Sequence, residues 1–560
     1  MFKNDTFSQS LPVCQVNGFS SSYGSQSYSP YNIIGEPQVY PRYGDASKSC
    51  VFRTYGQWWK KMPNHFPSVG VTPSWFSSDE FIILKFAKKL YANSVALYET
   101  YHPGCLVRIF LYNERNNSWR CGYSRRGPKI YHDNMESVCS LFQLKDVFFL
   151  CDTIRLEFDT SQSYYYTEID AVYLKGFLQG PRINIDAIET DLDRLTIQST
   201  SSHCSQQSLS LVDLPVFVMI KIFEFLSLDE VLNIGATCWC LRRLTMEPAI
   251  YSQLNLQPYW HSLNNDVFNH MVELKVRVTD LNLAWCSTGY TFPTFLWFLE
   301  KCCGSLKTLN LANTGISDNE MVAIANITPN LNNINVSRCC EIKNIAFISK
   351  WSSIVHLNIY GLDVTAKELI SVFMRNPGLK YLNMGAVTPL LDIIPVIKAL
   401  ADYCCGLISL DIWRACKTAS HFFFKELARL KDLEELDMGW INLPQSSGKE
   451  YREAMEAMKL FIGSSVNLKK LYLTANRHVD SHTMTIIANS LHRLEQLDIL
   501  GCSSVLPDDI FKVVSKCENL VFLDYSFSHA ASNKEFKEML LKKYPRVSFK
   551  TSFTIDSYSF

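Results

Sequence analysis

The sequence predicts a multidomain fold in which a β-sandwich precedes a small α-helical module and an α/β solenoid of repeats. At 560 residues the chain is too long for one hydrophobic core. Short runs of alternating apolar and polar residues fill much of its first third, and one apolar unit recurs through its second half. We place a disordered tail at 1–30, the sandwich at 31–178, a linker at 179–209, the helical module at 210–256, the solenoid at 257–550 and a C-terminal tail at 551–560.

The composition excludes several classes of protein. The chain carries 54 basic and 54 acidic residues, so it has no net field that would attract nucleic acid. Its 19 cysteines stand mostly in doublets without a second pair at zinc-ligand spacing, which predicts reduced, buried thiols and no metal site. No apolar run reaches the roughly 20 residues of a membrane helix, and no signal-peptide pattern opens the chain.

The first third reads as a tail followed by strands. Residues 1–30 are rich in serine and offer little to bury, which predicts disorder. Strand-length runs rich in β-branched and aromatic residues follow at 81–86, 94–99, 106–111, 154–158 and 170–174. Residues 154–158 followed by 166–174 resemble the closing hairpin of discoidin-like, galactose-binding-type β-sandwiches.

A short helical module begins near Leu214. Asp213 can cap a helix and Pro215 suits its first turn, while Ser227 starts a second helix and residues 238–244 a third. The string of Leu214-Pro215, Ile222-Phe223, Phe225-Leu226, Leu228, Val231-Leu232, Thr237-Cys238 and Leu241-Arg242 resembles the F-box, which docks on a Skp-type adaptor and through it on a cullin-RING ubiquitin ligase. The resemblance implies that the adaptor contacts are Leu214, Pro215, Ile222, Phe223, Leu226 and Val231. The alternative is a helical spacer that caps the solenoid.

Ten copies of Leu-x-x-Leu-x-Leu predict the solenoid. The second apolar residue of each copy is Leu281, Leu309, Ile334, Leu357, Leu382, Leu410, Leu436, Leu471, Leu497 or Leu523. Most neighbours are 23 to 28 residues apart, with one interval of 35 (471 minus 436) that contains a predicted helix over 449–461. This is leucine-rich-repeat spacing, in which each unit lays down a strand and returns through a helix, and a parallel sheet lines the concave face.

The middle residue of each Leu-x-Leu should project onto that concave face. These residues are asparagines in the first five copies and mostly aspartates in the last five. We therefore expect a protein substrate with Lys or Arg side chains to contact an aromatic and acidic surface made by Tyr360, Asp411, Trp413, Asp437, Trp440, Tyr472 and Asp498. We also expect these carboxylates to be too open to water to need perturbed pKa values. The alternative is that asparagine and aspartate are simply tolerated in a solvated sheet.

A catalytic interpretation finds no support in the sequence. There is no nucleophile with a base and an orienting group, no glycine-rich phosphate loop and no His-x-x-x-His metal helix. We expect neither catalysis nor a cofactor.

The whole domain order, together with residues 51–56, 98–104, 254–260 and 473–477, is similar to the family of F-box and leucine-rich-repeat protein four. The resemblance implies a non-catalytic substrate receptor of a Skp-cullin-F-box ligase that acts in the cytoplasm or nucleus, with a family association with the outer mitochondrial surface and turnover of mitophagy receptors. The N-terminus shows no targeting segment that would support mitochondrial localisation. The alternative is a ligase-independent scaffold whose sandwich binds a carbohydrate or lipid headgroup through a cluster at Trp58, Trp59, Lys60 and Lys61.

Overall fold

A computed structural model describes residues 8–56, 66–125, 136–161, 163, 165–178, 214–388, 390, 392–444 and 448–552. The predicted linker, the cluster at 58–61, the capping residue Asp213 and most of the C-terminal tail therefore lie outside the described residues. The chain divides into two compact units. Unit one consists of Met1–Arg53, Pro73–Asp159 and Thr167–Ile250, and unit two of Thr54–Thr72, Thr160–Tyr166 and Tyr251–Phe560.

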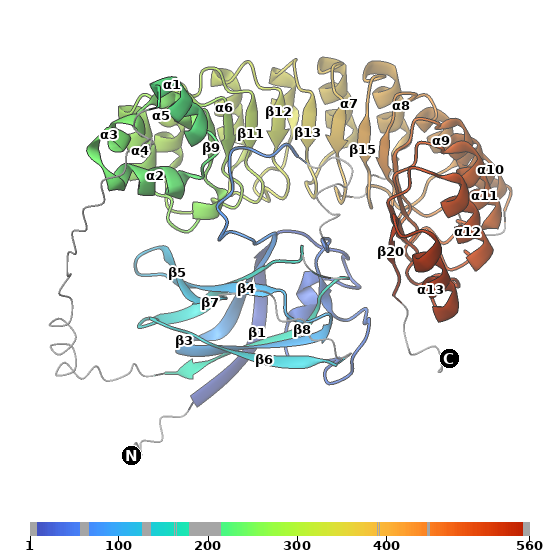
Figure 1. The fold of residues 1–560 in the computed structure, drawn as a ribbon, viewed down its shortest axis with the longest axis horizontal. Coiled ribbons are helices and arrows are strands. Elements are labelled where there is room, and N and C mark those ends of the chain that lie inside the picture. The colour runs from blue at the N-terminus through green and yellow to red at the C-terminus, as the bar shows by residue number, and fades with distance from the viewer. Residues whose placement is uncertain are drawn as a thin grey trace, which may run out of the picture. The chain divides into compact units, whose positions relative to one another are not determined.

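Unit one contains a β-sheet domain. Its strands are β1 (Ser8–Phe19), β2 (Cys50–Val51), β3 (Glu80–Tyr101), β4 (Leu106–Asn113), β5 (Ser118–Ser124), β6 (Val138–Gln143), β7 (Leu150–Phe158) and β8 (Glu168–Phe177), and a short 3-10 helix covers Pro30–Ile33. The strand order is β2-β8-β1-β3-β7-β4-β5, and β6 pairs with β3. The 22-residue β3 pairs with β1 and β7 along its first half and with β6 and β8 along its second half. This long strand thereby connects both parts of the sheet, and Figure 1 shows it among the strands of unit one.

The predicted disorder of residues 1–30 is wrong for the part that the structure describes. Ser8–Phe19 forms strand β1, which pairs with β8 and β3. Val13, Val16 and Phe19 are buried in the core of the domain. These apolar residues are three positions apart, and irregularities in the pairing with β3 after Val13 and after Val16 let all three face the core. Their burial outweighs the low mean hydropathy of the segment.

Three short helices follow in the same unit. They are α1 (Val216–Phe223), α2 (Leu228–Thr237) and α3 (Trp239–Leu244). Ser227 starts α2 as predicted, because Glu230 accepts hydrogen bonds from the backbone N–H of Ser227 at 2.8 Å and from its hydroxyl at 2.6 Å. These bonds lower the pKa of Glu230. The module is closed by close packing at Gly235, where a Cβ atom would lie 2.9 Å from the hydroxyl oxygen of Thr245.

Unit two is the repeat solenoid, whose arc of parallel strands and outer helices is plain in Figure 1. Its strands are β9 (Gln253–Asn255), β10 (Asp280–Asn282), β11 (Thr308–Asn310), β12 (Asn333–Asn335), β13 (His356–Asn358), β14 (Tyr381–Asn383), β15 (Ser409–Asp411), β16 (Glu435–Asp437), β17 (Lys470–Tyr472), β18 (Gln496–Asp498), β19 (Phe522–Asp524) and β20 (Ser548–Lys550). Its helices are α4 (Asn265–Glu273), α5 (Phe292–Cys302), α6 (Asp318–Ile327), α7 (Ala366–Arg375), α8 (Ile394–Tyr403), α9 (His421–Leu427), α10 (Lys449–Ser464), α11 (Ser481–Ser490), α12 (Pro507–Lys516) and α13 (Lys534–Lys543). Further 3-10 helices lie at Gln257–Tyr259 and Ala346–Lys350, and another, Pro248–Tyr251, spans the sequence boundary between the two units.

The repeats stack in register, as their phasing predicts. Leu281 lies opposite Leu309, and the equivalent residues match at every later pair of strands. The repeat with the shortest spacing returns through the 3-10 helix Ala346–Lys350 in place of an α-helix. The longest interval holds α10, as predicted, so its extra residues enlarge one repeat without breaking the stack.

Unit two also takes in two segments from the first third of the chain. The described residues of the first, 54–56 and 66–72, are called the strap below, and those of the second are 160, 161, 163, 165 and 166. Within this unit the ring of Phe66 packs edge-on against His356 of β13, with ring centroids 5.1 Å apart. Tyr165 contacts Phe527 in the same way at 6.2 Å. The sequence analysis did not predict these long-range contacts.

Candidate functional site

The F-box-like helices have a small core. Met219, Phe223, Val231 and Leu241 are buried within the module. Phe223 and Val231, two of the predicted adaptor contacts, thus belong to the core of the module. A side chain that is already packed in a core stabilises the module and is not available to a partner.

The other predicted adaptor contacts lie nearer the surface. Leu214 and Pro215 are exposed, and Ile222 and Leu226 are half-buried. They all belong to the first helix or its flanks.

Several larger apolar side chains on these helices were not among the predicted contacts. Phe225 is 78% exposed, Trp239 74% and Phe217 70%, and Leu232 and Val216 are also more than half exposed. The sequence did carry a signal for them, because its apolar positions were too many for one small core. So many large apolar side chains exposed on three short helices are typical of an interaction surface. We call Leu214, Phe217, Phe225, Leu232 and Trp239 the exposed apolar set.

The middle residues of the repeat strands have a structural task. In nine of these positions a side-chain oxygen accepts the backbone N–H two residues later, at 2.8 to 3.1 Å. The residues are Asn282, Asn310, Asn335, Asn358, Asn383, Asp411, Asp437, Asp498 and Asp524. An oxygen acceptor at this point fixes the turn that follows each strand. The asparagines and aspartates at these positions therefore stabilise the repeats, which is more than being tolerated in a solvated sheet.

The predicted substrate surface is not open. Tyr360, Asp411, Trp413, Asp437, Tyr472 and Asp498 are buried, and Trp440 is half-buried. Tyr472 donates its hydroxyl proton to Gln496, and the Thr474 hydroxyl donates to Asp498 at 3.0 Å. The expected exposure of this surface is therefore not found, because six of its seven residues are buried.

The two predicted tryptophan anchors share a cation within the solenoid. The guanidinium of Arg414 lies 5.4 Å from the ring centroid of Trp413 and 5.5 Å from that of Trp440. A backbone without a Cβ atom at Gly439 makes room for the Trp413 ring, because a Cβ there would lie 2.6 Å from its Cδ1 atom. Both aromatic faces therefore take part in contacts inside the protein.

The aspartates at the C-terminal end of the concave face are strongly perturbed, contrary to the expectation of unperturbed, hydrated carboxylates. Burial, together with the neighbouring charge of Asp524, holds the pKa of Asp498 well above its usual range. Burial likewise raises the pKa of Asp524, although the Tyr55 hydroxyl opposes this by donating a hydrogen bond to that carboxylate. Burial beside Asp524 also raises the pKa of Tyr55.

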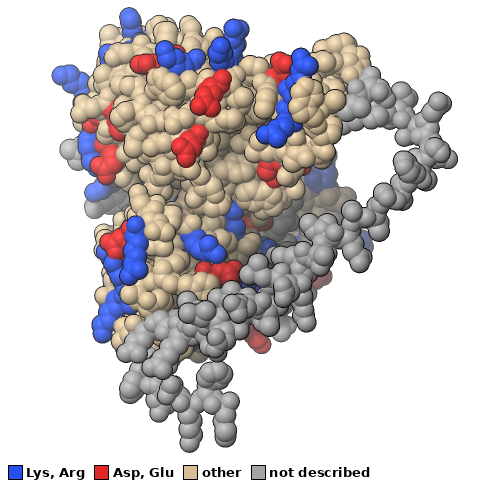
Figure 2. Space-filling model, turned by 90° about the vertical axis from the view of Figure 1, so that its left-hand side faces the viewer, with Lys and Arg blue, Asp and Glu red and all other residues tan. Residues whose placement is uncertain are grey.

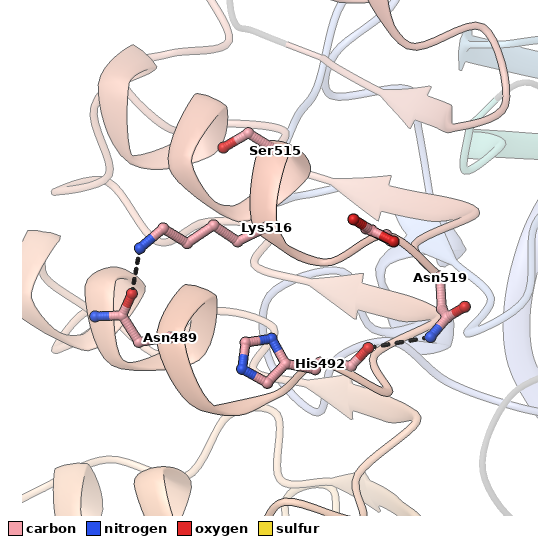
Figure 3. Close-up of a pocket in the computed structure, with 6 residues that line it drawn as sticks. Asn489, His492, Ser515, Lys516 and Asn519 are labelled. Carbon is pink, nitrogen blue, oxygen red and sulfur yellow. Dashed lines mark hydrogen bonds between the residues drawn. The ribbon is translucent and has the colours of Figure 1, made fainter.

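A hollow of about 800 Å³ lies between α11 and α12, lined by Asn489, His492, Ser515, Lys516, Glu518 and Asn519. Figure 3 shows that its polar groups bind one another: the Lys516 ammonium donates to Asn489 at 2.6 Å, and the Asn519 amide donates to the carbonyl of His492 at 3.1 Å. It contains no predicted site residue and no nucleophile held by a base, so it offers no active site.

The described residues carry few signs of other chemistry. No group of three His, Cys, Asp or Glu side chains among them could hold a metal ion, and none of their helices is long and apolar enough to cross a membrane. Every cysteine in the described part is a free thiol. On the face in Figure 2, basic and acidic side chains are scattered among uncharged ones without a large patch of one sign.

Comparison with known proteins agrees with the module and the repeats. The F-box-like family model matches residues 211–257. F-box/LRR-repeat protein 4 of Bos taurus is 31% identical over 575 aligned residues, which cover 96% of this chain and 91% of that protein. The chain belongs to the F-box/LRR-repeat protein 4 family.

Other similarities to this F-box/LRR-repeat protein 4 family member are more distant. F-box protein FBW2 of Arabidopsis thaliana is 25% identical over 220 residues, covering 37% of this chain and 68% of that protein. Among solved structures, an internalin from Listeria monocytogenes is 17% identical with a TM-score of 0.31, covering 52% of this chain and 76% of that one.

Proposed function

We propose that the chain is the substrate-recognition subunit of a Skp-cullin-F-box ubiquitin ligase and performs no catalysis itself. The observation that carries the proposal is the exposed apolar set on the F-box-like helices. Aromatic side chains such as Phe217, Phe225 and Trp239 supply much of the binding energy at protein interfaces. A Skp-type adaptor that covered them would link the chain to a cullin-RING core.

The test is a quantitative pulldown of a purified Skp-type adaptor by the full chain. We expect the double variant Phe217→Ala/Phe225→Ala to lose at least about tenfold in affinity, since each buried aromatic anchor at an interface is worth about 2 kcal/mol or more. Phe422→Ala is the matched control, because Phe422 is an equally apolar side chain, 54% exposed on helix α9 of the solenoid.

Two further outcomes give the pulldown its meaning. Phe223→Ala should weaken adaptor binding only together with a lower melting temperature of the chain, because Phe223 is a core residue. If the wild-type chain does not recover the adaptor, the ligase function is wrong and a ligase-independent scaffold is the better account.

The family relationship and the fold support narrower proposals. We infer that the sheet domain of unit one is a discoidin-like sandwich that assists substrate binding together with the repeats. We also infer that the substrates include mitophagy receptors at the outer mitochondrial surface. Comparing the abundance of such receptors in cells with and without this chain tests the second inference, and a proteasome inhibitor should abolish any difference.

A further inference from the structure

The described parts of the strap contact the repeat sheet at β19, β13 and β9. Tyr55 donates its hydroxyl proton to Asp524 of β19, Phe66 packs on His356 of β13, and Thr72 accepts a hydrogen bond from the Asn255 amide of β9 at 3.3 Å. The order of the contacts runs opposite to the order of the strands. The later part of the strap, 66–72, thus runs across the strands from β13 to β9, and it appears in blue beside them in Figure 1.

The length of the strap fits an extended path. From β13 to β9 there are four strand spacings, or about 19 Å at roughly 4.8 Å each. The six residue steps from Phe66 to Thr72 reach about 20 Å when the backbone is extended. The backbone leaves this extended path at Gly70, which already lies against β9, so the side chains of Phe66 and His356 cover part of the distance to β13.

The contacts of the strap are those of a bound peptide. Tyr55, Phe66 and Val69 are buried, as expected for anchoring side chains. Gly70 has a φ angle of +59°, and a Cβ atom there would lie 2.8 Å from the carbonyl oxygen of Gln253. Only glycine fits this approach without strain, so the strap lies directly against the backbone of β9 at this point.

A second aromatic group closes the C-terminal end. The ring of Tyr55 lies 5.2 Å from that of Tyr165 and 4.3 Å from that of Tyr166, both in the second inserted segment. The hydroxyls of Thr54 and Thr160 lie 2.9 Å apart, which ties the two segments together. The segments therefore cover this end as one cluster.

We propose that the concave face is a binding groove for an extended protein segment with aromatic anchors, and that the strap fills it in cis. Another protein segment of the same chemistry binds there only when the strap has left. The proposal goes beyond the ligase function and does not depend on adaptor binding.

The first test asks whether the strap covers the face in solution. Hydroxyl-radical footprinting of the full wild-type chain should oxidise Tyr55 and Phe66 at least about tenfold more slowly than Phe148, which is 66% exposed. Equal oxidation of Phe66 and Phe148 would show an open face and overturn the proposal.

The second test asks whether the groove accepts a segment in trans. A fluorescent peptide with the sequence of residues 52–73 is titrated against the full chain, and binding is followed by anisotropy. We expect the peptide to bind the variant Gly70→Val, in which the new side chain forces the strap away. The wild type should show no binding at peptide concentrations up to 100 times the dissociation constant of that variant. Gly304→Val is the control, because a Cβ atom at Gly304 meets nothing within 4 Å.

Each outcome of the second test is decisive. Binding to Gly70→Val and not to the wild type or Gly304→Val supports a groove filled in cis. Binding to none of them, while Gly70→Val keeps its helical circular dichroism and its adaptor affinity, shows that the face is a fixed internal interface. If Gly70→Val unfolds, Tyr55→Phe takes its place, since that variant loses only a hydroxyl group.

Discussion

The hydrogen bond between Tyr55 and Asp524 offers a sharp test of the closed concave face. Both residues are fully buried, and the Tyr55 hydroxyl donates to one carboxylate oxygen of Asp524. The other oxygen accepts the backbone N–H of Ser526 at 2.9 Å. Tyr55→Phe removes one donor without changing the shape of the ring, so the buried carboxylate loses one of its hydrogen bonds.

The expected cost follows from that loss. Removing one hydrogen bond from a buried charged group costs about 1–3 kcal/mol. At roughly 1.4 kcal/mol per tenfold, the amide protons of β19 should exchange about 5- to 150-fold faster wherever exchange proceeds through opening of the C-terminal repeats. Tyr403→Phe is the control and should change nothing, because the side chain of Tyr403 is exposed on helix α8.

The effect should also depend on pH in a defined direction. The Tyr55 hydroxyl favours the charged form of Asp524, so its removal raises the pKa of that buried carboxyl further. A carboxyl whose folded pKa is raised contributes stability that is lost as the pH rises through that pKa. Tyr55→Phe should therefore cost more at pH 8 than at pH 5.

A double-mutant cycle with Asp524→Asn isolates the interaction. In the Asp524→Asn background, Tyr55→Phe no longer removes a hydrogen bond from a charged group, so we expect a coupling free energy of about 1–2 kcal/mol. If the two changes add within about 0.3 kcal/mol, or if the cost of Tyr55→Phe does not change with pH, Tyr55 does not hold the strap to the sheet through this hydrogen bond.

Three other substitutions test the interior of the solenoid. Asp498→Asn should raise the free energy of unfolding at pH 8, where the buried charge of this carboxyl with its raised pKa destabilises the fold. Near pH 3 the carboxyl is protonated in both the folded and the unfolded state, so the substitution should leave the free energy of unfolding nearly unchanged. Urea titrations at both pH values check this. Gly439→Ala should cost about 1–3 kcal/mol, because the new Cβ would lie 2.6 Å from Trp413, whereas Gly378→Ala, with nothing within 4 Å, should cost less in the same titration. Trp351→Phe should cost at least about 1–3 kcal/mol in thermal unfolding, since the buried indole N–H donates to a backbone carbonyl at 2.7 Å.

The phasing of the solenoid could be predicted because it follows from a short local sequence pattern that recurs in every repeat. Each copy carries the same apolar positions, and Leu281, Leu309 and their equivalents are all fully buried. The helix in the long interval was predictable for the same reason, since its own residues are amphipathic. Strand β1 was missed because the composition of its serine-rich stretch was weighed above the positions of Val13, Val16 and Phe19.

The closure of the concave face could not be predicted in this way. Tyr55 and Asp524 are 469 residues apart, and the local sequence pattern around each residue does not indicate a contact with the other. The sequence does not distinguish an aspartate whose oxygen fixes a turn from an aspartate that binds a substrate, because both occupy the same position in the repeat. Burial distinguishes the structural aspartate from the substrate-binding one, and burial depends on which distant segment covers the sheet.

Occupation of the groove in cis sets a condition on any rival ligand. A tethered segment competes at an effective concentration on the order of millimolar, whereas a cellular protein is present at micromolar concentration or less. A rival that made only the same contacts as the strap would therefore be excluded by a factor of about a thousand. It needs roughly 4 kcal/mol of additional binding energy, or a loosened strap, to enter. No such condition applies to the exposed apolar set, so adaptor binding and entry to the groove should be separable: Phe225→Ala should affect the first alone, and Gly70→Val the second alone.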